Sequence, residues 1–143
     1  MLQPTTAEVL TFALELADAA DEVTLRHYRA GGTAWRKADG SMVTLGDTEA
    51  ESMLRSRIAA RYPEHRVLGE EEGLTLPPMP MDPPAGEEGP PPSWVLDPID
   101  GTHNFLRGIP VWATLIACER RGRVEAGVVS APALGMRWWA GRG

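Results

Sequence analysis

The chain contains the stretch Trp94-Val95-Leu96-Asp97-Pro98-Ile99-Asp100-Gly101-Thr102. Its first three residues predict a short buried strand, and Pro98 then fixes φ and removes one amide donor, which stiffens the backbone. A stiff turn can direct the carboxylates of Asp97 and Asp100 to one point, with the Ile99 carbonyl between them as a third hard oxygen. Mg²⁺ and Mn²⁺ prefer such ligands, so the stretch predicts a divalent metal site.

The residues that follow predict an anion site beside the metal site. Residues 101–105 should open a short helix, in which Gly101 permits a close approach of the backbone and the first amides have no partner within the helix. Carboxylates that face amides across a few ångströms are explained if a divalent metal and a phosphate fill the gap together. The implied chemistry is metal-assisted hydrolysis of a phosphoester.

Two further acidic segments fall where helices or strands should begin or end. They are Glu70-Glu71-Glu72, between two glycines, and Asp47, at the start of a helix. Taken alone, the glutamates fit a solvated loop, Asp47 fits a helix N-cap and Asp100 fits a turn. Three separate clusters have no structural need in common, so their combination favours a site.

The composition is that of one folded domain. The chain has 143 residues, of which 43% are hydrophobic and 24% charged. The net charge of -6 argues against nucleic acid as a partner. A single cysteine points to a reducing compartment, and we expect a cytoplasmic protein because the sequence has neither a leader pattern nor a membrane-length apolar run.

Hydrophobic spacing predicts an α+β fold, with two N-terminal helices on a mostly antiparallel sheet. The first helix should span Thr5 to Arg29, with Thr5 and Glu8 as a capping box, and the second should run from Asp47 or Thr48 to Arg61. A turn is expected at Asp39-Gly40. Short strands are expected at residues 66–68, 94–96, 111–119 and 123–130, the last two forming a hairpin.

Two segments stand apart from this pattern. Residues 76–93 hold eight of the thirteen prolines and are expected to form a flexible surface loop. Arg137-Trp138-Trp139 resembles a further strand, for which the sequence offers no pairing partner. One sheet face should then be uncovered, so we expect a fragment, a split gene product or a chain that needs a partner.

The motifs resemble those of the inositol monophosphatase superfamily of Mg²⁺-dependent, lithium-sensitive phosphatases. The resemblance rests on Gly69-Glu70-Glu71, on the stretch from Trp94 to Phe105, and on residues 42–47 with Glu51. Residues 109–116 and 128–139 look closest to the bacterial histidinol-phosphatase branch. The resemblance implies that residues 1–143 form the metal-binding N-terminal half of a layered α/β/α/β/α sugar-phosphatase fold, without its C-terminal half.

The resemblance also implies a set of ligands for two or three Mg²⁺ ions. Glu70, Asp97 and the Ile99 carbonyl would hold the first ion, Asp97 and Asp100 the second, and Glu70 would reach a third through water. Mn²⁺ could replace Mg²⁺, and Li⁺ is the expected inhibitor. Glu71 would orient ligands from behind, and Lys37 would lie near the outer ion.

The same resemblance assigns the catalytic groups. Thr102, hydrogen-bonded to Asp47, would position the attacking water near Glu70 for in-line attack on phosphorus. The amides of Gly101 and Thr102 would bind phosphate oxygens. The family supplies a further metal-binding Asp in its C-terminal half, which this sequence does not reach. We therefore expect weak binding of the second metal and little or no activity from these 143 residues alone.

Several functions stay open at this stage. The substrate would be a small phosphorylated metabolite: histidinol phosphate, inositol 1-phosphate or a 3'-phosphoadenosine-type nucleotide. The complete protein would form a homodimer, or the chain would be complemented by a separate C-terminal half. A different class of function is a non-catalytic subunit whose uncovered sheet face is an interaction module. His65 is interpreted as a surface or cap residue and His103 as variable surface.

Overall fold

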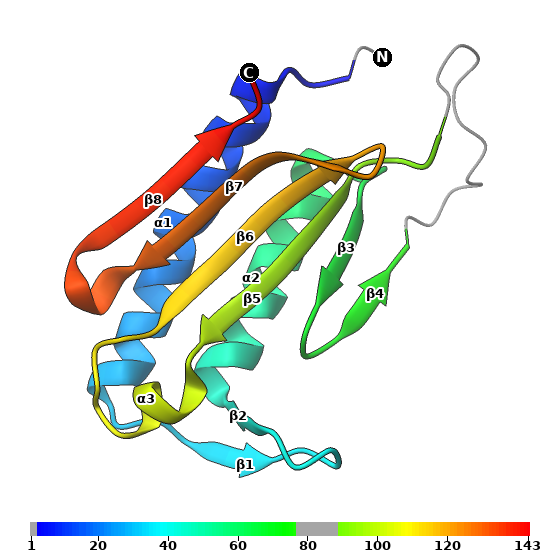
Figure 1. The fold of residues 1–143 in the computed structure, drawn as a ribbon. Helices are drawn as coiled ribbons and strands as arrows, with labels where there is room; N and C mark the ends of the chain where they lie inside the picture. The colour runs from blue at the N-terminus through cyan, green and yellow to red at the C-terminus, as the bar shows by residue number, and fades with distance from the viewer. Residues whose placement is uncertain (1–2, 77–88) are drawn as a thin grey trace.

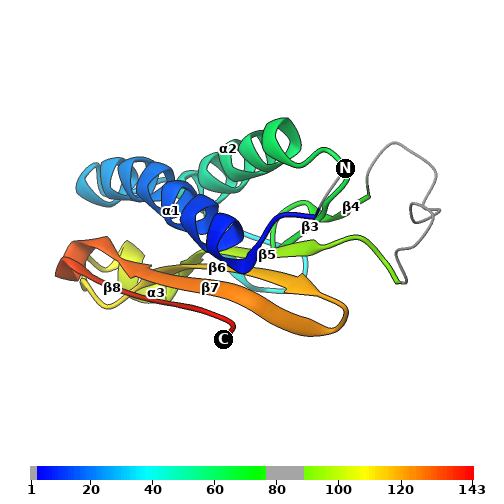
Figure 2. The same cartoon turned by 90° about the horizontal axis from the view of Figure 1, so that it is seen from above.

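The computed structural model describes residues 3–76 and 89–143. Two long helices, α1 (Thr6–Arg29) and α2 (Leu45–Arg61), lie on one face of a six-stranded sheet (Figures 1 and 2). The opposite face carries no helix of comparable length among the described residues. Within those residues, no helix is both long enough and apolar enough to span a membrane.

Helix α1 begins as its sequence predicts. The Thr5 side chain accepts the Glu8 amide, and the Glu8 carboxylate accepts the Thr5 amide in return. The buried residues recur every three or four positions and form one stripe toward the sheet: Val9, Ala13, Leu16, Ala17, Ala20, Val23 and Thr24. The predicted helix over residues 5–29 is confirmed.

Helix α2 begins at Leu45, two residues earlier than predicted. Thr44 is the N-cap, and Asp47 is the third helical residue, which closes a capping box with Thr44. The interpretation of Asp47 as the N-cap was therefore wrong by three residues. Thr44 also ends β2 (Met42–Thr44), which pairs with β1 (Ala34–Arg36) across the predicted Asp39-Gly40 turn.

The main sheet is mixed, with four antiparallel pairs of neighbouring strands and one parallel pair. Its order is β4-β3-β5-β6-β7-β8, and only β3 and β5 run parallel. The strands are β3 (Arg66–Gly69), β4 (Gly73–Thr75), β5 (Ser93–Asp100), β6 (Ala113–Arg120), β7 (Arg123–Ala131) and β8 (Met136–Gly141). The mostly antiparallel sheet is confirmed, whereas β4 was not predicted.

Strand β5 is longer than its apolar run suggests. It continues past Leu96 through Asp97 and Pro98 to Asp100, with a shift of register against β6 between the two aspartates. Such an irregularity accommodates a proline, which cannot donate to the ladder. The Thr114 hydroxyl donates to the Pro98 carbonyl at 2.8 Å. The two aspartates thus lie within a strand, and the short helix α3 (Thr102–Leu106) follows directly.

The expectation that residues 137–139 lack a pairing partner was wrong. They belong to β8, which pairs with β7 and forms the edge of the sheet. Arg137 also ties β8 to α1, because its guanidinium contacts Asp18 and Asp21, each at 2.7 Å. Most of the proline-rich loop, residues 77–88, lies outside the described residues, and Ser93 at its end already belongs to β5.

His65 is a core residue, which corrects its interpretation as a surface or cap residue. Only 4% of it is exposed. Its Nδ1 accepts the indole N–H of the fully buried Trp94 at 3.0 Å, and its ring stacks on Tyr62 with centroids 4.5 Å apart. Burial lowers the pKa of His65 to about 4, and the charge of Arg120 acts in the same direction.

This burial predicts an acid-sensitive fold. The unfolded chain takes up a proton at His65 near pH 6.5, whereas the folded chain does so near pH 4, so stability is full above pH 6.5 and falls between these values. From pH 7 to pH 4.5 the loss from this group should be roughly 2–3 kcal/mol. His65→Gln, whose carbonyl can still accept from Trp94, should remove this loss in urea unfolding.

The matched control is His103→Gln, because His103 is exposed and lines no part of the core. This variant should keep the pH dependence of the wild type. An unchanged acid loss in His65→Gln would contradict the prediction.

Candidate active site

Three separate segments bring acidic residues to one end of the sheet. Strands β3 and β5 run parallel, with Gly69 beside Leu96. The residues that come next in the sequence, Glu70 and Asp97, therefore lie at adjacent positions. Asp100 ends β5, and Asp47 lies in the first turn of α2. The parallel pair therefore brings together two of the predicted ligand segments.

A cavity of about 600 Å³ lies at this end of the sheet. Of the predicted site residues, Lys37, Glu70, Gly101 and Thr102 line it, whereas Asp47, Glu71, Asp97 and Asp100 are not among its lining residues. The remaining lining residues were not predicted as site residues: Asp39, Ser41, Met42, His103 and Asn104. His103, interpreted as variable surface, is thus part of the cavity wall.

Asp97 has the least favourable electrostatic environment of the site. Its Oδ1 atom is buried and has no hydrogen-bond partner. The pKa of Asp97 is raised to about 7, first by burial and then by the negative charges of Glu70, Asp100, Asp47 and Glu71, in that order. The carboxylates of all three predicted clusters therefore act on one another in this fold.

Asp47 and Thr102 do not form the hydrogen bond that was expected between them. The Asp47 Oδ2 atom accepts the Thr44 amide at 2.8 Å and the Thr44 hydroxyl at 2.9 Å. The Thr102 hydroxyl donates instead to the Ile99 carbonyl at 3.3 Å. Capping of α2 thus occupies Asp47, whose pKa burial raises to about 6.

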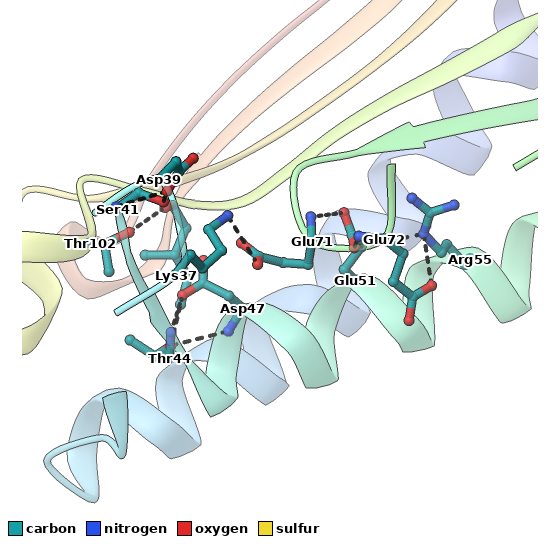
Figure 3. A network of polar contacts seen from close by, with 11 residues as sticks. Lys37, Asp39, Ser41, Thr44, Asp47, Glu51, Arg55, Glu71, Glu72 and Thr102 are labelled. Carbon is teal, nitrogen blue, oxygen red and sulfur yellow. Dashed lines mark hydrogen bonds and ion pairs between the residues drawn. The ribbon is translucent and has the colours of Figure 1, made fainter. Parts of the chain in front are cut away.

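Glu71 and Lys37 form an ion pair between the β3–β4 turn and the β1–β2 hairpin (Figure 3). The Lys37 Nζ atom lies 3.3 Å from Glu71 Oε2, and the Glu71 side chain is only 8% exposed. Burial raises the pKa of Glu71, and the ion pair with Lys37 opposes this shift. Lys37 thus compensates Glu71 rather than Glu70 in this structure.

Two residues of α2 that hold this region were not assigned a role from the sequence. Glu51 is fully buried and its carboxylate accepts the amides of Glu71 and Glu72, while Arg55 contacts the same turn. Their spacing in the sequence could have indicated this role. Glu51 and Arg55 are four residues apart, and this spacing puts them on the same side of the helix as the buried Leu54 and Ile58. Charged side chains on the buried side of a helix require partners.

Gly101 occupies a position that only glycine fits. Its φ is +95°, and a Cβ atom there would lie 3.2 Å from the Val111 carbonyl oxygen. The chain therefore makes a sharp change of direction between Asp100 and Thr102. That change of direction places Gly101 and Thr102 on the cavity wall.

The donor atoms fit a divalent cation by their chemistry, although the side chains are not gathered around one point. The described residues contain no group of three or more His, Cys, Asp or Glu side chains placed to hold a metal ion. The expectation that Glu70, Asp97 and Asp100 converge is thus not met in these side-chain positions. The buried, unpartnered Asp97 Oδ1 and the neighbouring carboxylates are the hard oxygen ligands that Mg²⁺ takes.

Comparison with known proteins identifies the relatives of this chain. The model of the inositol monophosphatase family matches residues 5–143. A histidinol-phosphatase of Mycobacterium tuberculosis is 45% identical over 139 residues, covering 94% of this chain and 48% of the relative. A histidinol-phosphatase of Streptomyces coelicolor is 43% identical, covering 92% of this chain and 47% of the relative.

The fold is similar to that of a solved structure. The crystal structure of the extragenic suppressor protein SuhB from Bartonella henselae matches with a TM-score of 0.81 and 27% identity, covering 94% of this chain and 49% of that one. The chain thus spans about half the length of the relatives it matches. With the family model matched over residues 5–143, the chain belongs to the inositol monophosphatase family.

Proposed function

We propose that the complete protein is a Mg²⁺-dependent phosphomonoester hydrolase. The observation that carries the proposal is Asp97, a buried carboxylate with an unpartnered oxygen, on which Glu70, Asp100, Asp47 and Glu71 all exert a negative potential. Burial of several like charges is unfavourable unless a cation joins them. The phosphatase names of the relatives agree with this use of the site.

The ligands we propose are Glu70, Asp97, the Ile99 carbonyl and Asp100. A bound divalent cation supplies positive charge for a phosphate group and lowers the pKa of a water molecule. Glu70 lines the cavity, where its carboxylate can accept a proton from that water. Thr102 lines the same cavity and its hydroxyl can orient the water toward phosphorus once it turns from the Ile99 carbonyl. Mn²⁺ should replace Mg²⁺, and Li⁺ should inhibit.

The phosphate group would bind at Gly101 and Thr102. The absence of a side chain at Gly101 allows a ligand to approach the backbone closely. Asp47 would stabilise the start of α2 through its hydrogen bond with Thr44. A contact between Asp47 and Thr102 would form only after a change of side-chain rotamer. Lys37, which lines the same cavity, adds a positive charge that attracts a phosphorylated substrate.

Histidinol phosphate is the first substrate to test, because both relatives named above are histidinol-phosphatases. Inositol 1-phosphate is the second, after the family name. A 3'-phosphoadenosine-type nucleotide is the third. Phosphate release by the complete protein, with and without Mg²⁺, compares the three directly.

The first prediction concerns turnover. Asp97→Asn in the complete protein should lower Mg²⁺-dependent phosphate release by about 100-fold or more, because the amide removes a charged ligand. Asp18→Asn, the same change on the exposed face of α1, is the control and should leave the rate unchanged. An unchanged rate in Asp97→Asn would refute the ligand assignment.

A second prediction separates function from stability. In the absence of metal at pH 8, Asp97→Asn should raise the free energy of unfolding, on the order of 1 kcal/mol, because the buried negative charge is gone. The pKa of Asp97 is raised to about 7, so the folded chain binds the proton more tightly than the unfolded one and the wild type recovers stability as the pH falls from 8 to 5. Urea unfolding at both values should show the full gain at pH 8 and a smaller gain at pH 5, where the unfolded aspartate is still ionised.

A third prediction concerns these 143 residues alone. Because they span about half the length of the relatives, we expect little or no phosphate release from them. The measurement is a phosphate assay with Mg²⁺ on the purified chain, next to the complete protein. Robust turnover by the short chain would contradict this expectation.

The second candidate function is that of an interaction module, favoured by the helix-free face of the sheet. Strand register places apolar residues in two adjacent rows on that face: Leu68, Val95 and Ala117, then Leu115, Val129 and Trp138. Trp138 is 51% exposed. Such a continuous apolar surface is typical of a covered face.

Size-exclusion chromatography compares the two functions. Co-expression with a polypeptide corresponding to the other half of the relatives should give a stable complex if the face is an interface. A complex that forms without metal and has no phosphatase activity would favour the interaction module. Metal-dependent phosphate release would favour the hydrolase, and the complete protein should then elute as a homodimer.

A further inference from the structure

The turn between β3 and β4 is held from the side of α2. The Glu51 carboxylate accepts two consecutive backbone amides of this turn, that of Glu71 on Oε1 at 3.2 Å and that of Glu72 on Oε2 at 2.7 Å (Figure 3). Hydrogen bonds to a charged acceptor are stronger than neutral ones. A single side chain thus fixes the direction of two successive peptide groups.

Gly69 shows how closely this carboxylate approaches the turn. A Cβ atom on Gly69 would lie 1.7 Å from Glu51 Oε1 and 2.5 Å from its Cδ. The φ of Gly69 is not in the left-handed region, so backbone conformation does not require glycine there. The Glu51 carboxylate and the Arg55 guanidinium thus leave no room for a side chain at position 69. Glu70 lies between this close approach and the Glu71 amide that Glu51 accepts.

Arg55 compensates the buried charge of Glu51. The Glu51 side chain is 0% exposed, and the Arg55 Nε atom lies 3.7 Å from its Oε2 and 3.1 Å from Glu72 Oε2. The Arg55 guanidinium also donates to the Thr75 hydroxyl at 2.7 Å and to the Gly73 carbonyl. Arg55 thus binds the far side of the turn and both the first and the last residue of β4.

Packing alone does not call for this arrangement. Helix α2 already buries Ala50, Leu54 and Ile58 against the rest of the core. A buried ion pair contributes little net stability, because desolvation offsets the attraction. Its advantage over an apolar contact is direction, since hydrogen bonds constrain the angle as well as the distance of the groups they join.

We propose that Glu51 is a positioning residue, which orients the β3–β4 turn so that Glu70 faces the cavity. The importance of this role for activity rests on the proposed phosphatase function, in which Glu70 is a metal ligand. The orientation itself is a property of the chain without any ligand. The two statements can therefore fail separately.

The test compares Glu51→Gln with the wild type in two measurements. The carboxamide can accept only one of the two amides and presents an N–H group to the other, so exchange of the Glu71 or Glu72 amide hydrogen should accelerate about tenfold. The second measurement is the dissociation constant for Mn²⁺ by electron paramagnetic resonance, which should rise about tenfold. Amides of the β6–β7 pair report on the rest of the fold and should exchange at wild-type rates.

The control is Glu49→Gln, the same substitution two residues away on α2. Glu49 is paired with Arg26 and His27 and makes no contact with the turn. This variant should leave both measurements unchanged. Glu51→Asp keeps the charge but is one methylene shorter, and it should give values between those of the wild type and Glu51→Gln.

Each outcome decides the proposal. In the wild type the Glu71 and Glu72 amides should be protected from exchange, which can be measured even if Glu51→Gln does not fold. Unprotected amides, or unchanged exchange in Glu51→Gln, would overturn the positioning role and leave the phosphatase proposal intact. A wild type that binds no Mn²⁺ would overturn the proposed metal site, and the exchange rates alone would then decide whether Glu51 orients the turn.

Discussion

The parallel pairing of β3 with β5 is the contact on which the site depends. The two strands run in the same direction with Gly69 beside Leu96, so the next residues, Glu70 and Asp97, lie side by side although 27 positions separate them in the sequence. Antiparallel neighbours would have sent the two residues to opposite ends of the sheet. The rest of the site is arranged around this edge, with α2 on one side and the β1–β2 hairpin on the other.

The proximity of the acids is unfavourable for the folded chain, and the pKa values of Asp97 and Asp47 express this directly. Both are raised, to about 7 and about 6, with burial as the first cause. Two basic residues partly compensate the negative charge of this region. Lys37 pairs with Glu71, and Arg55 pairs with Glu51 and Glu72. Neither reaches Asp97, whose Oδ1 stays without a partner.

Local signals predicted much of the fold and part of the site. Thr5 and Glu8 fixed the start of α1, and the acidic stretch around Asp97 pointed to the correct end of the sheet. The partner of β8 and the burial of His65 depend on contacts between residues far apart in the sequence, which periodicity does not encode. The N-cap was placed three positions too late, at Asp47, because Thr44 caps the helix ahead of it. Glu51 was hidden because its partners are backbone amides, which leave no signature in side-chain composition.

The contact of Arg137 with Asp18 and Asp21 has a consequence for the order in which the chain is assembled. These residues are more than a hundred positions apart, and the core that α1 completes includes Ala126 and Val128 of β7. The ribosome makes α1 before the strands beneath it, so the apolar side of this helix is synthesised well before its neighbours. Until β7 and β8 emerge, the apolar stripe of α1 has no sheet to pack against and must be kept out of water by other contacts.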